Sequence, residues 1–398
     1  MKLKILNYHP FFLPSRGGTE TNIFSFAEHS RHEHYVLTDM LPDTKEQEKV
    51  GAVEVVRARP SHLSTPPLGV APADAFLELP RELVKMLTLR DFDYDILHLR
   101  FGSITPRLFV GIDNRIGRAL FTKLAAWRTS NQPVLVTFHT LPSHTDSGLG
   151  SEASSRYNKS WREIETFFCG QAESIICLDE FMVEPLRDMS GGKQVFLVPS
   201  GVDTDLFKPA DREQSLEHLP SSVREAIDES KTNVLSVARV EPVKGAHLLR
   251  QLSEVLPDDI NLIIAGRGYK SPEAGWRNTK LVGDMPNEMI PHLINSCDMA
   301  INLTVAPGVG RFTFEAIACG KPTIRLSPGK LHPLTDKKNV LLVQDITEAL
   351  KWIRELHGND SLRKEMSQHA LETRDTISVS TYAKEVDSIY EEIVGGND

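Results

Sequence analysis

Short apolar segments alternate with longer amphipathic segments along most of this chain. Short apolar runs bounded by glycine, proline or polar residues are typical of buried strands. In the first half we expect strands at residues 3–8, 34–38, 53–58, 95–99, 133–138, 174–178 and 195–198. In the second half we expect them at 234–238, 260–265 and 281–282, in a segment that ends near residue 303, after residue 322, and at 340–343.

Helical periodicity fills most of the segments between these strands. We expect helices at residues 21–30, 155–170, 181–189, 246–256, 287–295, 346–357, 360–373 and 380–394, and one that begins at about residue 311. Strands that alternate with helices predict parallel sheets covered on both faces. The fold class is therefore α/β, with Rossmann-like α/β/α domains.

The division into domains follows from a change in composition. Residues 210–232 are polar and acidic, and the strand–helix alternation restarts after them. The 398 residues also exceed the size of one ordinary core. We expect one domain at residues 1–209 and a second at 210–375, with a cleft between them. Residues 376–398 contain a helix with one apolar face, which we expect to dock back on the first domain.

The overall charge limits the classes of partner. A net charge of −9 and a pI of about 5.9 argue against a general nucleic-acid binder. A basic amphipathic segment at residues 105–128 is compatible with peripheral contact to an anionic membrane. A packed helix with a solvated basic face explains that segment too, and is favoured.

The spacing of the cysteines and the lengths of the apolar runs both indicate a cytoplasmic location. The four cysteines show no C-x-x-C spacing, so we expect reduced core residues and no metal site. The N-terminus lacks the features of a signal peptide, and no apolar run reaches the roughly 20 residues of a membrane helix. We expect a cytoplasmic protein, with a peripheral position at the inner membrane face as the open alternative.

The stretch at residues 302–324 combines a strand end, a turn with two glycines and a helix start. The first amides of a helix lack internal partners, and the helix dipole favours an anion there. We expect a diphosphate over Gly310, Arg311 and Phe312, and hydroxyls such as those of a ribose at Glu315. A plain tight turn, with Glu315 solvated, explains the same residues equally well.

Two features of the first half also lie at strand ends. Gly17 and Gly18 follow the first strand, and glycines let a ligand approach the backbone closely. Taken alone, that pair is better explained as a plain strand–helix turn. His139 ends the strand at 133–138, at the edge of the sheet where α/β proteins bind ligands. The alternative is a histidine that merely terminates the strand.

Several landmarks appear together in a fixed order. They are Gly17–Glu20, Thr137–Thr140, Val198–Asp203 with Phe207–Pro209, Ala238–Arg239 with Lys244–Gly245, and Glu315–Pro322. Over nearly its full length the chain resembles the retaining nucleotide-sugar glycosyltransferases of the GT-B fold, glycosyltransferase family 4. The resemblance implies that the first domain serves the acceptor and the second holds the donor.

The resemblance also implies residue roles. Arg239 and Lys244 would neutralise the donor diphosphate as it leaves, and His139 would contact the donor sugar and support transfer. Gly17 and Gly18 would approach the donor phosphates or sugar. No obligate metal or other cofactor is implied, because cationic side chains take the place of a metal. The D-x-D spacings at residues 91–93 and 203–205 lie away from this site and are interpreted as solvated.

The sequence departs from the family pattern at the sugar end. The family commonly has a glutamate eight positions before the one that matches Glu315, and this chain has Pro307 there. Arg311 is also unusual, and phosphate, an anionic donor and solvent are all open as its partner. Asp179 replaces a serine that is common in the family.

The expected function is transfer of a sugar, with retention of anomeric configuration, from a nucleotide-diphosphate sugar to a hydroxyl acceptor. The acceptor is a glycan, a lipid-linked molecule or a small molecule. Pro307 favours an alternative, a catalytically weak GT-B protein that binds nucleotide and partners an active transferase. A third hypothesis is another GT-B activity, such as an epimerase or a phosphorylase.

Overall fold

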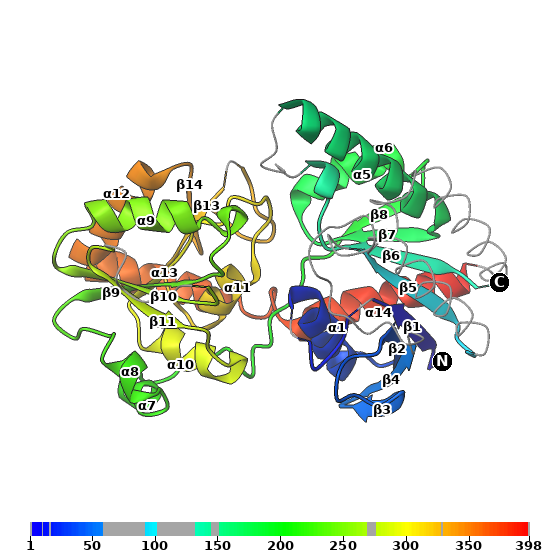
Figure 1. The fold of residues 1–398 in the computed structure, drawn as a ribbon, viewed down its shortest axis with the longest axis horizontal. Coiled ribbons are helices and arrows are strands. Elements are labelled where there is room, and N and C mark those ends of the chain that lie inside the picture. Colours follow the sequence, from blue (N-terminus) through cyan, green and yellow to red (C-terminus); the bar gives the residue numbers. More distant parts are fainter. Residues whose placement is uncertain are drawn as a thin grey trace. The chain divides into compact units, whose positions relative to one another are not determined.

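The computed structural model describes residues 2–9, 11–15, 17–58, 92–101, 132–144, 151–268, 276–327 and 329–396. The chain divides into two compact units (Figure 1). The first unit comprises Met1–Ser200 and Tyr382–Asp398, and the second comprises Gly201–Thr381. The basic segment expected at residues 105–128 lies outside the described residues, so its membrane role stays a prediction from the sequence.

The first unit is built on one sheet with the strand order β3-β4-β2-β1-β5-β6-β7-β8. The strands are β1 (Lys4–Tyr8), β2 (Glu33–Asp39), β3 (Gln47–Val50), β4 (Val53–Ala58), β5 (Ile96–Phe101), β6 (Val134–Phe138), β7 (Ser174–Cys177) and β8 (Gln194–Leu197). All neighbours are parallel except β3 and β4. The sequence did not predict β3, because this edge strand is polar and largely exposed.

Helices cover both faces of this sheet, as the continuous burial of its central strands requires. They are α1 (Gly18–His29), α5 (Ser151–Gln171), α6 (Val183–Met189) and α14 (Val379–Gly395), with short 3₁₀ turns η2 (Pro142–His144) and η3 (Glu180–Met182). Leu97 and Leu99 pack in the core that includes α5 and α6. Ile5 and Ile96 pack in the core that α1 and α14 share.

Helix α1 begins at Gly18, earlier than the residue 21 that the sequence predicted. Gly17 is its N-cap, in an extended conformation that glycine tolerates well at this position. Glu20 in the first turn complements the positive end of the helix dipole. The glycine pair is therefore part of the helix start.

The second unit contains a six-stranded sheet of order β11-β10-β9-β12-β13-β14, in which every neighbouring pair is parallel. The strands are β9 (Thr232–Val237), β10 (Ile260–Ala265), β11 (Thr279–Gly283), β12 (Met299–Asn302), β13 (Thr323–Leu326) and β14 (Leu341–Val343). This is the doubly wound order, in which the chain reverses direction across the sheet between β9 and β12.

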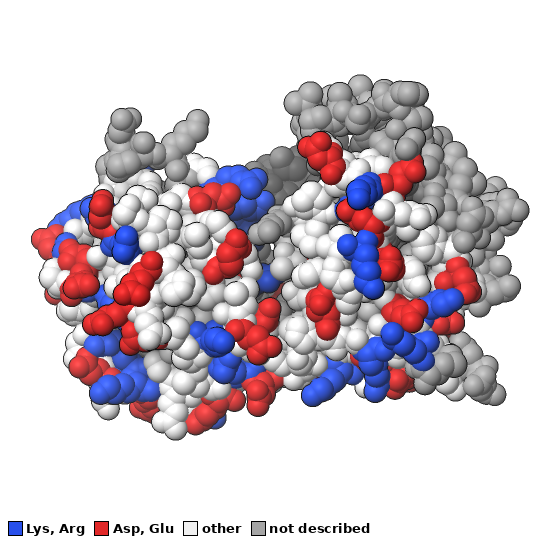
Figure 2. Space-filling view, turned by 90° about the horizontal axis from the view of Figure 1, so that it is seen from below, with Lys and Arg blue, Asp and Glu red and all other residues white. Residues whose placement is uncertain are grey.

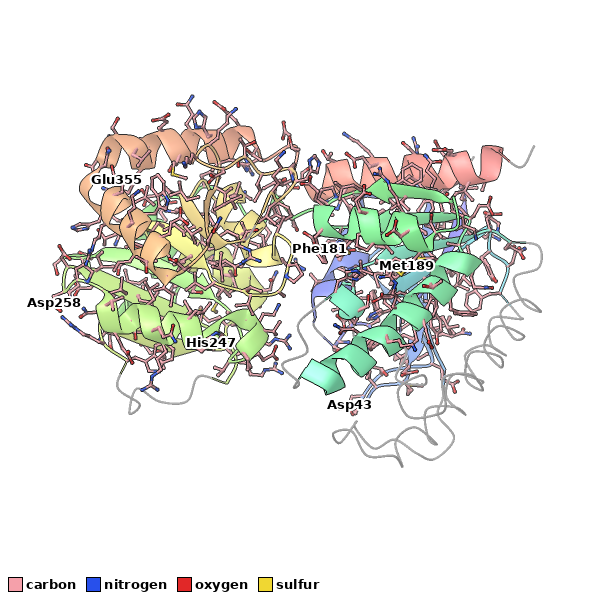
Figure 3. The ribbon with its side chains drawn as sticks, turned by 90° about the horizontal axis from the view of Figure 1, so that it is seen from above. Asp43, Phe181, Met189, His247, Asp258 and Glu355 are labelled. Atoms are coloured by element: carbon pink, nitrogen blue, oxygen red, sulfur yellow. The ribbon has the colours of Figure 1, made fainter. Side chains whose placement is uncertain are left out.

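The helices of the second unit lie on both faces of its sheet (Figure 1). They are α7 (Arg212–Glu217), α8 (Ser221–Arg224), α9 (Ala246–Val255), α10 (Ile290–Asn295), α11 (Arg311–Ala318), α12 (Ile346–Gly358) and α13 (Asp360–Glu372), with 3₁₀ turns η4 (Pro242–Lys244) and η6 (Asn287–Met289). Val234 packs in the core with α9 and α12, whereas its neighbour Leu235 packs with α10 and α11. Figure 3 labels His247, in the first turn of α9, and Asp258, just past its end.

The boundary of the units differs from the expected residue 209. Val202 and Phe207 are buried in the core of the second unit. The Val202 N–H donates to the Ile377 carbonyl at 2.8 Å, and the Val202 carbonyl accepts from the Val379 N–H at 2.9 Å. Residues 201–209 therefore belong with the second unit. From Tyr382 onward, the apolar face of α14 packs on the sheet of the first unit.

Acidic and basic side chains are interspersed over the face of the molecule that Figure 2 shows. Among the described residues, none of the helices is both long and apolar enough to cross a lipid bilayer. Cys169, Cys177, Cys297 and Cys319 are buried and form no disulfide, in agreement with their interpretation as core residues.

Candidate functional site

The reversal point of the second sheet brings two loops together. One loop, residues 238–245, follows β9, and the other, residues 303–310, follows β12. In doubly wound sheets, ligands bind at the carboxyl ends of the two strands that flank this point. All six second-unit residues predicted for the site lie on these two loops or in the helix that follows the second loop.

Backbone contacts fix the two loops against each other. The Val305 N–H donates to the Val243 carbonyl at 3.0 Å. Gly245 has φ of 75°, and a Cβ atom there would lie 2.0 Å from the Leu303 carbonyl oxygen. Only glycine permits this approach. Lys244 is therefore held beside the start of the second loop.

Lys244 supplies a cation at this edge of the sheet. Partial burial lowers its pKa, the positive charges of Arg239 and Arg325 lower it further, and Glu241 opposes them. Within the described residues, no hydrogen bond or ion pair engages the Lys244 ammonium. Arg239 is more exposed, and its Nη1 lies 3.4 Å from a carboxylate oxygen of Glu241. Both cations are thus available to an anionic ligand.

The second loop ends at the N-terminus of α11. Gly310 is the N-cap with φ of 76°, and a Cβ atom there would lie 2.9 Å from Asn302 Nδ2. Among the residues that the structure describes, no acceptor receives the amide N–H groups of Gly310, Arg311 and Phe312. Unpartnered amides at the positive end of a helix can bind an anion, which stays a prediction from the sequence for these three positions.

Glu315 lies one turn into α11 and is buried, with 6% of its surface exposed. This burial contradicts the alternative in which Glu315 is simply solvated. Its Oε1 accepts a hydrogen bond from Arg311 Nε at 2.7 Å. The sequence left phosphate, an anionic donor and solvent open as partners of Arg311. The structure instead shows an ion pair with Glu315 within the same helix. Because a carboxylate has two oxygens, Oε2 remains for a ligand hydroxyl.

Sequence reasoning missed three polar residues that hold this site. Asn302 Nδ2 donates to Thr313 Oγ1 at 2.9 Å, and Asn302 Oδ1 accepts from the Thr304 N–H at 3.1 Å. Arg325 on β13 is buried and contacts the second loop through its guanidinium. In the sequence, the one indication of a special role for Arg325 was a charged residue between two apolar residues of a short strand.

In the first unit, the Gly17–Gly18 pair lies beside a carboxylate. A Cβ atom on Gly17 would lie 2.4 Å from Glu20 Oε2, so the Glu20 side chain folds back over this glycine. Burial raises the pKa of Glu20. A carboxylate at this helix start repels phosphate and accepts hydrogen bonds from neutral hydroxyls. The site therefore suits a sugar better than a phosphate.

His139 directly follows β6. Its backbone N–H donates to the Phe101 carbonyl at 2.8 Å, which extends the ladder between β5 and β6. The ring Nε2 is buried, and no residue in the described part of the chain hydrogen-bonds to it. Burial, together with the positive charges of Arg100 and His9, holds the pKa of His139 well below its usual range. The imidazole is therefore neutral at neutral pH.

A buried carboxyl anchors the segment that follows His139. Glu165 of α5 has no exposed surface, and its Oε1 accepts the Ser143 N–H at 3.0 Å. The Ser143 hydroxyl donates to Oε2 of the same carboxyl. Burial raises the pKa of Glu165 to about 7, against the hydrogen bonds from Ser143 that lower it.

The predicted residues thus fall into two groups. The first unit carries Gly17, Gly18 and His139, and the second unit gathers Arg239, Lys244, Gly310, Arg311, Phe312 and Glu315. Asp203 accepts the backbone N–H groups of Asp205 and Leu206, which gives this D-x-D segment a structural role. No cluster of three metal-binding side chains occurs among the described residues.

Comparison with known families gives two matches. Residues 116–206 match the family described as Glycosyltransferase Family 4, and residues 239–390 match the family described as Glycosyl transferase-like. The chain is 24% identical to the D-inositol 3-phosphate glycosyltransferase of Mycobacterium sp. (strain KMS) over 214 residues. That region is 50% of this chain and 47% of the relative, so the chain spans about half the length of the curated relatives that it matches.

Similar solved structures cover almost the whole chain. Sucrose-phosphate synthase from Thermosynechococcus elongatus superposes with a TM-score of 0.77 at 16% identity, covering 99% of this chain and 100% of that one. Anabaena HepE, solved in complex with UDP-glucose, superposes with a TM-score of 0.70 at 17% identity, covering 98% and 100%. At these identities the likeness shows a shared fold.

Proposed function

We propose that this chain, which resembles glycosyltransferases of the family 4 type in sequence and has the GT-B fold, catalyses a sugar-transfer reaction. The donor is a nucleotide-diphosphate sugar, the acceptor is a hydroxyl group, and the anomeric configuration is retained. One observation carries the proposal: two adjoining loops of the second unit bring together the Lys244 ammonium and the amides at Gly310–Phe312, and none of these groups has a partner among the described residues. Cation and amides together suit a diphosphate.

The diphosphate is the leaving group of this reaction. When the bond between the sugar and the diphosphate breaks, negative charge grows on the phosphate oxygens. Lys244 provides a compact positive charge, and Arg239 provides a planar fork that can bind two oxygens at once. Groups fixed before the reaction stabilise the transition state without further reorganisation. These side chains perform the task that a metal ion performs in other enzymes, and no metal enters the proposal.

Glu315 would hold the nucleoside. Its Oε1 is occupied by Arg311, which leaves Oε2 to accept hydrogen bonds from ribose hydroxyls. In this proposal Arg311 supports Glu315 and does not contact the donor sugar.

The sugar end of the donor is where this chain differs from its family. Pro307 offers neither a carboxylate nor an amide hydrogen for the sugar hydroxyls. In the first unit, the neutral ring of His139 and the carboxyl of Glu20 beside Gly17 and Gly18 are acceptors suited to such hydroxyls. We propose that they contribute to sugar recognition.

The acceptor is proposed only as a hydroxyl compound. The curated relatives include enzymes named for D-inositol 3-phosphate, a polyhydroxylated compound. A lipid-linked acceptor and a peripheral membrane contact remain predictions, because the basic segment that suggested them lies outside the described residues. If the amount of protein that co-sediments with liposomes does not depend on their anionic lipid content, the membrane contact is contradicted.

The test is a panel of UDP-, GDP- and ADP-sugars with simple polyol acceptors. We expect release of the nucleoside diphosphate with at least one donor, and a product whose anomeric configuration, read by NMR, matches that of the donor. Inversion would contradict the retaining mechanism. Absence of release with every donor would contradict sugar transfer.

Pro307 favours one second candidate, a nucleotide-binding protein with little or no transferase activity of its own. The same panel separates the two functions when binding is measured alongside turnover. Tight binding of a nucleoside diphosphate without turnover of any donor supports the second candidate.

A further inference from the structure

Arg325 is a fully buried arginine on β13, which lies between β12 and the edge strand β14 of the second sheet. It pairs with Asn302 of β12 and Leu342 of β14, and 1% of its surface is exposed. Its guanidinium donates mainly to carbonyls of the loop between β12 and α11: Thr304 (Nη1, 2.6 Å), Ala306 (Nη2, 3.0 Å), Gly308 (Nη2, 2.6 Å) and Val309 (Nε, 2.9 Å). One side chain thus gathers the loop around itself.

These contacts fix the direction of the loop amides. The peptide bonds of this loop are trans. In a trans peptide the carbonyl of one residue and the N–H of the next point in opposite directions. The carbonyls of Thr304, Gly308 and Val309 point at Arg325, so the N–H groups of Val305, Val309 and Gly310 point away from it.

Two of these outward amides lead to the candidate site. The Val305 N–H bonds to Val243 and ties the loop to the segment of Lys244. The Gly310 N–H begins the series of unpartnered amides that Arg311 and Phe312 continue. The Ala306 carbonyl also points at Arg325, but the next residue is Pro307, whose nitrogen carries no hydrogen.

We infer that Arg325 is a positioning residue, which turns the loop carbonyls inward and so presents the Gly310 amide, at the start of α11, to the donor diphosphate. The inference rests on the proposed function. Arginine suits the task because its guanidinium carries five N–H donors in one rigid plane. Lysine has three donors on a flexible stem, and an apolar residue has none.

The binding test compares Arg325→Lys, Arg325→Met and the wild type, with Arg277→Met as control. Arg277 lies in the same unit and is exposed, with an ion pair to Asp258. Calorimetry with UDP, GDP and ADP, and ligand-observed NMR with the matching nucleosides, give the affinities. We expect the diphosphate affinity to fall about tenfold or more in Arg325→Met, and less in Arg325→Lys. The nucleoside affinity should change little.

A second measurement does not depend on binding. Amide hydrogen exchange in Arg325→Lys should quicken in residues 303–312 and stay unchanged in α12 of the same unit. This readout still applies if Arg325→Met does not fold. Wild-type exchange in the loop, or equal loss of nucleoside and diphosphate affinity, would overturn the positioning role. If the wild type binds none of the three diphosphates, the proposed function fails as well.

Discussion

Arg311 Nε lies 2.7 Å from Glu315 Oε1, and this ion pair spans the first turn of α11. The Glu315 side chain is 8% exposed and that of Arg311 is 31% exposed, so the pair is shielded from most solvent. The pair fixes the orientation of a carboxylate next to the helix-start amides, which have no partner among the described residues. Arg311 thus offsets the negative charge of a buried carboxylate that lies close to a proposed anion site.

Removal of that arginine should cost stability. Arg311→Leu leaves the Glu315 charge buried without its cation, and we expect a loss of about 1–3 kcal/mol in the free energy of unfolding. Arg250→Leu is the control, because Arg250 pairs with Glu254 at 3.8 Å with the same i,i+4 spacing but on an exposed face. The control should lose less than about 0.5 kcal/mol. Equal losses in urea unfolding would contradict the buried pair.

Glu315→Gln tests the ribose contact. The wild type should bind a nucleoside diphosphate about tenfold or more tightly than its 2′,3′-dideoxy analogue, because the hydroxyls donate to a charged acceptor. The variant should lose most of that difference while its affinity for the dideoxy analogue stays similar. A variant that still discriminates as well as the wild type would place the ribose elsewhere.

His139→Ala tests the first unit. We expect turnover to fall by about 100-fold, the usual scale for a group that assists the reaction directly. Since the pKa of His139 lies well below its usual range, the ring stays neutral throughout the neutral region. The ratio of wild-type to variant turnover should therefore be constant between about pH 6 and pH 8. A ratio that changes across this window would show that His139 titrates there.

Glu165→Gln tests the buried carboxyl behind the segment after His139. The folded pKa of about 7 lies above the ordinary value of 4.5, so the folded state holds the proton more tightly. The protonated Glu165 carboxyl therefore stabilises the folded state at low pH, and this stabilisation is lost as the pH rises through about 7. Glutamine does not titrate.

The stability of Glu165→Gln relative to the wild type should therefore increase by about 3 kcal/mol between about pH 4.5 and pH 8. Urea unfolding followed by tryptophan fluorescence measures it, since Trp161 is buried in the same unit. A difference that is independent of pH would show that the folded carboxyl titrates normally.

The sequence predicted the backbone of the site better than its side-chain contacts. Apolar runs place β9 and β12, and the start of α11 follows from the glycine turn before Arg311. Arg311 and Glu315 are four positions apart on a predicted helix, so their ion pair could have been predicted from the sequence. The contacts of Arg325 have no such signal, because a strand pattern does not say which carbonyls a side chain meets.

The unit boundary was misplaced for a similar reason. Val202 and Phe207 are apolar residues in a loop, and their burial depends on a core that forms from distant segments. The composition becomes polar and acidic at residue 210, but residues 201–209 already pack with the second unit. Only tertiary contacts locate such a boundary.

The central claim is that the two loops of the second unit bind the donor diphosphate, with Lys244 as the cation. The most direct measurement is calorimetric titration of the wild type, Lys244→Ala and Lys280→Ala with UDP, GDP and ADP. Lys280 is an exposed lysine on β11 of the same unit. We expect one preferred nucleotide, which binds Lys244→Ala about tenfold or more weakly than the wild type and binds Lys280→Ala as tightly as the wild type. No binding of any of the three, or binding indifferent to Lys244, would contradict it.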